Sequence, residues 1–156
     1  MLNSPDNSDL SAWHLYFAKV ANNRAWQLSV ESRDAAGDRE MLDAAHASAW
    51  HWQVVGTEIH RMRSAMLLAE VHAALGHGDI AMRYAQTVRD YFLGKPDTPD
   101  WEIAFTHLVY AHAAHAAGDS AEHRRAYEEA VRAVDAIAEG EDRDIVVASL
   151  RRVPAP

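Results

Sequence analysis

Histidines are the side chains of this sequence that are best suited to chemistry. The chain of 156 residues contains ten of them. His72 stands six residues before Gly78 and His112 six residues before Gly118, so the two histidines occupy matching places. His115 follows His112 by three residues, a spacing that puts both side chains on one face of a helix. Such imidazoles could recognise a polar ligand, or bind Zn, Fe or Ni together with a carboxylate.

Three interpretations of these histidines stay open. A histidine on a partly buried helix face often hydrogen-bonds a neighbour and serves only the core. The second interpretation is a polar surface that recognises a peptide, a C-terminal carboxylate or a small anion. The third is a metal site, although the sequence contains no His-x-x-x-His pair, no His-Glu-x-x-His motif and no Glu-x-x-His motif.

Patterns that are typical of enzymes are missing from the sequence. It has no Cys, no Gly-x-Ser-x-Gly elbow, and no glycine-rich loop that follows a strand. We therefore expect a non-enzymatic protein without a cofactor. The alternative is a His-rich helical protein that binds a metal or a small ligand, or an enzyme of that kind.

Composition narrows the class of protein. With 156 residues, 49% of them hydrophobic, residues 1–156 are expected to form a single domain with its own core. The formal charge of −8 and the lack of a basic cluster argue against nucleic acid and against anionic membrane surfaces. The N-terminus has no apolar signal region and no stretch is apolar enough to span a bilayer, so we expect a cytoplasmic protein.

The elements that must position the histidines are helices. Apolar residues recur at helical spacing, and no strand pattern of period two is present. Three Gly-Asp pairs, Gly37-Asp38, Gly78-Asp79 and Gly118-Asp119, recur at a near-constant interval and are predicted to be the turns within helix pairs. The sequence predicts a disordered tail at 1–8, helix pairs at about 9–55, 57–93 and 98–139, and a capping helix at about 142–152.

The repeated units resemble tetratricopeptide repeats, and the best match covers residues 104–131. Ala111, the turn at Gly118-Asp119, Tyr127 and Ala130 stand at family positions, whereas the interval of about forty exceeds the family's period of about 34. The resemblance implies a TPR-like right-handed array of three antiparallel helix pairs. It also implies a concave surface, lined by the first helix of each pair, that binds a peptide or protein partner.

The register of that family assigns the candidate binding residues. It implies that one polar groove is lined by His72, His112, His115, Arg24, Gln27 and Glu31. It assigns no catalytic residue and no metal ligand.

Self-association is a further expectation from the sequence. Three repeated units leave two apolar ends, which such arrays must cover. Either the segment that contains Trp13, Tyr16 and Phe17 or the predicted helix at 142–152 could cap an end or form a homodimer.

Overall fold

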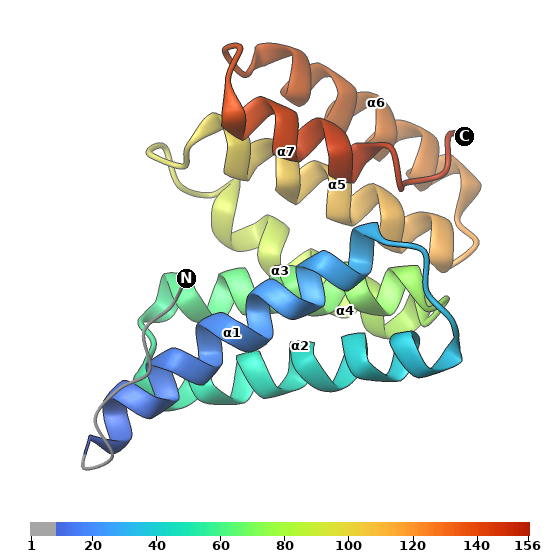
Figure 1. Cartoon of the computed structure of the whole chain (residues 1–156). Helices are drawn as coiled ribbons and strands as arrows, with labels where there is room; N and C mark the ends of the chain where they lie inside the picture. Colours follow the sequence, from blue (N-terminus) through green and yellow to red (C-terminus); the bar gives the residue numbers. More distant parts are fainter. Residues whose placement is uncertain (1–8) are drawn as a thin grey trace.

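The computed structural model describes residues 9–156, and this part of the chain folds into seven helices (Figure 1). Their bounds are α1 (Leu10–Val30), α2 (Ala35–Val55), α3 (Glu58–Ala74), α4 (Gly78–Phe92), α5 (Asp100–Ala116), α6 (Ser120–Ala136) and α7 (Glu141–Leu150). The predicted all-α class is therefore confirmed. The tail predicted at 1–8 lies outside the described residues.

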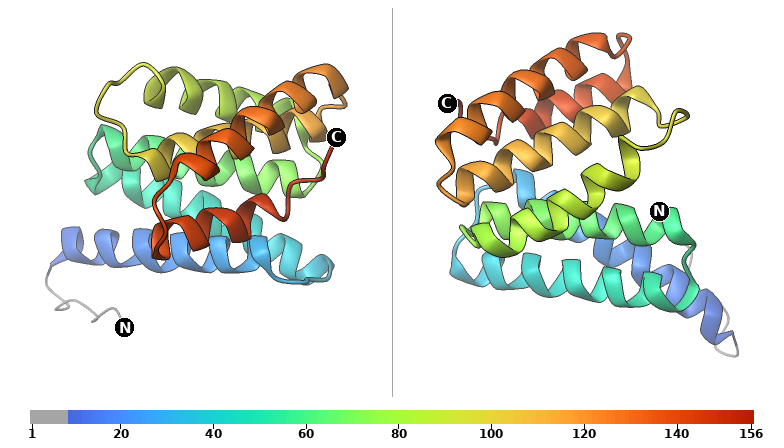
Figure 2. Two further views of the ribbon diagram at one scale, coloured as in Figure 1. Left: turned by 90° about the horizontal axis from the view of Figure 1, so that it is seen from above. Right: turned by 180° about the vertical axis from the view of Figure 1, so that it is seen from behind.

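Helices that follow one another along the chain pack together as antiparallel pairs (Figures 1 and 2). The first helix of each pair also contacts the first helix of the next, so α1 lies against α3 and α3 against α5. Helix α3 touches α1, α2, α4 and α5, which agrees with the central place that its largely apolar sequence predicts. Helix α7 lies against α5 and α6. No helix within residues 9–156 is both long enough and apolar enough to cross a membrane.

The second helices of the first two pairs bury the same pattern of positions. Small side chains in this pattern let neighbouring helices approach closely, and larger ones fill the space at the far end of each helix. The buried positions of α2 recur in the same order in α4: Met41, Ala45, Ser48 and Trp52, then Ala81, Ala85, Val88 and Phe92.

The first predicted turn, at Gly37-Asp38, is wrong. Both residues lie in the first turn of α2, because Asp34 caps this helix by accepting backbone N–H groups at 3.1 and 2.9 Å. Helix α1 has already ended at Val30, and the Arg33 guanidinium donates to the carbonyl oxygen of Leu28 at 2.9 Å. The cap at Asp34 therefore ends the linker between α1 and α2 three residues before Gly37.

The second predicted turn is displaced by two residues. Gly76, with a φ of 74°, takes the left-handed conformation that ends α3, as Gly118 does after α5 with a φ of 76°. Gly78 instead begins α4 and faces the backbone of Ala117, where an added Cβ would lie 2.5 Å from backbone atoms. Helices α3 (58–74) and α5 (100–116) have equal lengths, and equivalent positions in them are 42 residues apart. The Gly-Asp pairs predict an interval of 40.

Candidate functional site

His112 pairs with Glu70, not with a ligand groove. The alignment of α3 with α5 makes these two residues equivalent on neighbouring helices, and the Nδ1 atom of His112 lies 3.1 Å from each carboxylate oxygen of Glu70. Both side chains are buried. Burial alone lowers the pKa of His112, but the charge of Glu70 and the hydrogen bond to it outweigh burial and raise the pKa. The pair is a buried contact in the core between α3 and α5, and it is ionic when His112 is protonated.

His72 lies in a different environment, between α2, α3 and α4. Its Nδ1 atom is 3.1 Å from the Nδ1 atom of His77, and its ring stacks on Tyr84 at a centroid distance of 6.0 Å. The ring of His46 approaches it edge-on at 5.6 Å. Burial, together with the two neighbouring imidazoles, lowers the pKa of His72. The neutral ring therefore suits this position.

His115 is exposed near the end of α5, where its ring lies 4.9 Å from the ring of His123. Its contact differs from those of His72 and His112, so the three histidines belong to three separate contact groups. Within residues 9–156, no group of three or more His, Asp or Glu side chains is placed to hold a metal ion.

The predicted residues of α1 form their own chain of contacts. Arg24 donates to both carboxylate oxygens of Glu40 on α2, at 2.6 and 3.0 Å, and Gln27 donates to Glu31 at 2.8 Å. These contacts are exposed on the α1–α2 pair, and their partners differ from those of His72, His112 and His115. A binding role for the six predicted residues stays a prediction, but the structure does not gather them in one groove.

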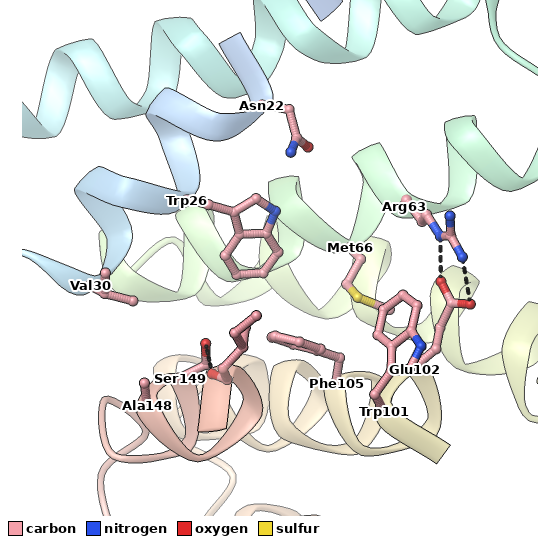
Figure 3. Close-up of a pocket in the computed structure, with 11 residues that line it drawn as sticks. Asn22, Trp26, Val30, Arg63, Met66, Trp101, Glu102, Phe105, Ala148 and Ser149 are labelled. Atoms are coloured by element: carbon pink, nitrogen blue, oxygen red, sulfur yellow. Dashed lines mark hydrogen bonds and ion pairs between the residues drawn. The ribbon is translucent and has the colours of Figure 1, made fainter. Parts of the chain in front are cut away.

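The first helices of the pairs do enclose a pocket, with a volume of about 410 Å³ (Figure 3). Trp26 of α1, Met66 of α3, and Trp101 and Phe105 of α5 supply most of its apolar wall. Helix α7 closes another side with Ala148. The ring centroids of Trp26 and Phe105 are 5.5 Å apart across the junction of α1 and α5. Elements from both ends of the described chain therefore build one cavity.

Sequence reasoning treated these aromatic residues as separate parts of the core. Trp26, Met66 and Phe105 follow one another at nearly the same interval as the Gly-Asp pairs. They meet because α1 and α5 both lie against α3, and not because of that spacing, since α3 and α5 are offset by 42 residues. Large apolar residues recurring on the first helix of each pair were the signal in the sequence that could have suggested a shared pocket.

An ion pair forms the polar end of the pocket. Arg63 of α3 donates to Glu102 of α5 through Nε at 2.6 Å and through Nη2 at 3.1 Å (Figure 3). The Glu102 side chain is 1% exposed and the Arg63 side chain is 42% exposed. The hydrogen bond to Glu102 raises the pKa of Arg63, and the guanidinium also lies 5.3 Å from the ring centroid of Trp101. This arrangement fixes a permanent cation beside an aromatic wall.

The pocket therefore offers two kinds of contact. Its wall favours an apolar group through burial and dispersion. The Nη1 atom of Arg63 makes no hydrogen bond to any residue of the described chain, so it can donate to an acceptor on a bound molecule. Comparisons of the chain with protein-family models, curated proteins and solved structures give no match to any of them.

Proposed function

We propose that the protein is a non-enzymatic binding module that takes an apolar side chain of a peptide or protein partner into the pocket between α1, α3, α5 and α7. The observation that carries this proposal is the wall of two Trp, one Phe and one Met, gathered from three helices. Aromatic anchors that fill such pockets supply much of the energy of protein interfaces. The resemblance to tetratricopeptide repeats supports the same function, because that family binds partners on its first helices.

The ion pair of Arg63 and Glu102 favours a partner that carries a hydrogen-bond acceptor next to its apolar group. The guanidinium of Arg63 is held in place by Glu102 and by the face of Trp101, so little side-chain entropy is lost when Nη1 donates to a partner. A backbone carbonyl or a carboxylate next to a large apolar side chain satisfies both features. None of the six residues predicted from the sequence lines this pocket, so this proposal does not depend on them.

A small apolar molecule with one acceptor group is the second candidate. The pocket volume of about 410 Å³ supports it, because ligand sites of proteins commonly measure about 300–1,000 Å³. A peptide anchor and a free small molecule would use the same wall, so one pocket-filling variant tests both candidates.

Ala148→Trp is the variant that fills the pocket. Ala148 lies on α7 and lines the cavity, so a larger side chain can occupy the space without a change in the core. Ala121→Trp on α6 is the matched control, because Ala121 is an exposed helical alanine that does not line the pocket. Circular dichroism and thermal unfolding would show that both variants are folded.

The assay selects peptides from a display library on the wild-type chain and then measures their affinity for each variant. We expect enriched peptides to share a large apolar residue, to bind Ala148→Trp at least tenfold more weakly, and to bind Ala121→Trp as well as wild type. Equal binding to Ala148→Trp would place the site elsewhere. If no peptide is enriched, but a naphthalene sulfonate probe binds wild type and not Ala148→Trp, the small-molecule candidate is favoured.

A further inference from the structure

The three most exposed of the large apolar side chains lie outside the pocket, on one part of the first helix pair. We call residues 10–23 of α1 and 44–55 of α2 the arm. Six of the nine large apolar side chains that are exposed within residues 9–156 belong to it, among them Leu10 at 75%, Trp50 at 58% and Val54 at 53% exposed. The first turns of α1 project beyond the neighbouring helices (Figures 1 and 2). A single exposed apolar residue is ordinary, but a contiguous group marks an interaction site.

Ring contacts join two of these exposed side chains, Trp50 and Phe17, through the histidines between them. The ring of Trp50 lies 5.3 Å from that of His14 and 4.8 Å from that of His51. Phe17 continues the series, at 5.6 Å from His51 and 5.4 Å from Trp13. The surface therefore runs from α2 across to α1 without a break.

The arm is almost free of charge. Lys19 is the one Asp, Glu, Lys or Arg residue in it, although these four types make up 24% of the whole chain. Interface cores are depleted of charged residues and enriched in Trp, Tyr and Phe, as the arm is. A patch of this composition is typical of an interface between subunits, because subunit interfaces are more apolar than transient interfaces.

A furrow with a volume of about 600 Å³ runs between α1 and α2, and six of its eleven lining residues belong to the arm. The part of its lining that belongs to the arm includes Ala21, Ala44 and Ala47, together with Phe17 and Val20. Beyond the arm, the furrow continues between charged side chains of the same two helices. The arm thus presents both projecting side chains and a hollow that can receive them. A surface that carries both can fit a copy of itself across a twofold axis.

We propose that the arm binds the arm of a second copy of this chain, so that two helix pairs form a four-helix bundle around Phe17 and Trp50. Two copies that each carry a charge of −8 repel one another over most of their surface, but on the arm only Lys19 is charged. At about 1.5 Å per residue, the part of α1 in the arm spans about 21 Å, and two helices are about 20 Å wide. The flat footprint is about 420 Å² per copy, or about 840 Å² for the two copies together, which is slightly below the roughly 1,000 Å² of specific interfaces.

The test is the molar mass of the full chain in solution, measured by light scattering after size exclusion at tens of micromolar. We expect twice the chain mass of 17.4 kDa for wild type and the single mass for Trp50→Glu and Val54→Glu, with unchanged circular dichroism. Ile80→Glu, at a position that is 43% exposed on α4, is the control and should remain dimeric. A monomeric wild type would overturn the proposal, and so would dimers of both arm variants.

A second measurement does not depend on the glutamate variants folding. The chain contains no Cys, so Ala47→Cys provides a single thiol in the furrow. We expect a short bis-maleimide to link two copies of Ala47→Cys and to leave Ala121→Cys on α6 unlinked. Equal linking of the two variants, or none of Ala47→Cys, would contradict an interface at the arm.

Discussion

Replacing His112 by Leu removes one partner of a buried charge pair and leaves the other. Both oxygens of the Glu70 carboxylate lie 3.1 Å from the Nδ1 atom of His112 and share its one N–H, and the Glu70 side chain lies in the core between α3 and α5. Breaking a buried pair in this way destabilises a protein by about 3–5 kcal/mol. We expect His112→Leu to lower the free energy of unfolding by that amount at pH 7, as measured by urea denaturation. If His112 instead faced an open groove, the loss would stay within about 0.5 kcal/mol.

The double variant Glu70→Leu/His112→Leu separates lost charge pairing from lost packing. Replacing both partners of a buried pair by apolar residues is often neutral or stabilising, by about 1–4 kcal/mol. We therefore expect the double variant to recover most of the stability that His112→Leu loses. A double variant no more stable than the single one would refute the ionic interpretation of the pair.

The pH dependence gives an independent check. The pKa of His112 is raised in the folded protein, so its stabilising effect is fully present below the unfolded pKa of about 6.5 and is lost as pH rises through the folded pKa. In Glu70→Gln the charge that raises this pKa is absent. We expect the stability difference between wild type and Glu70→Gln to shrink as the pH rises from about 6.5 through the folded pKa of His112. A difference that grows over this interval would contradict the reasoning.

Two further predictions concern the turns. Gly78→Ala should destabilise the protein by about 1–3 kcal/mol, because the new Cβ meets the backbone of Ala117. Gly76→Ala should cost about 1 kcal/mol, since the φ of Gly76 is positive but no atom lies within 4 Å of the added Cβ. If urea denaturation showed a larger loss for Gly76→Ala than for Gly78→Ala, the close approach of α4 to α5 would be contradicted. Asp34→Ala should lose about 1 kcal/mol while Asp34→Asn keeps the cap of α2, and equal thermal midpoints for the two would show that Asp34 is not a cap.

Helical periodicity was enough to predict the helix pairs, but not the alignment of one pair with the next. Apolar spacing placed the helices, because each must bury one face. The Gly-Asp pairs then suggested a uniform offset that the caps do not follow: Asp34 begins α2 early, and Gly76 ends α3 two residues before Gly78. A short sequence pattern does not specify which of several nearby glycines or aspartates serves the turn.

The shift of two residues explains why the predicted site was not assembled. With the offset that the Gly-Asp pairs suggest, His72 was the expected counterpart of His112; with the offset that the helices adopt, the counterpart is Glu70. Two residues rotate a side chain by about 200° around a helix, which is enough to exchange the two faces. The contact between Arg63 and Glu102 likewise depends on how α3 and α5 are aligned, and neither residue alone signals it.

Helices α1 and α7 meet the same cavity, through Trp26 and Ala148, although they come from opposite ends of the described chain. A molecule bound in this cavity would contact α1 and α7 as well as α3 and α5, and would therefore hold the first and last helices against the central ones. Local unfolding of α1 or α7 would then require the bound molecule to dissociate, because only the folded helices form the cavity. Binding in the cavity would therefore slow amide hydrogen exchange most in α1 and α7.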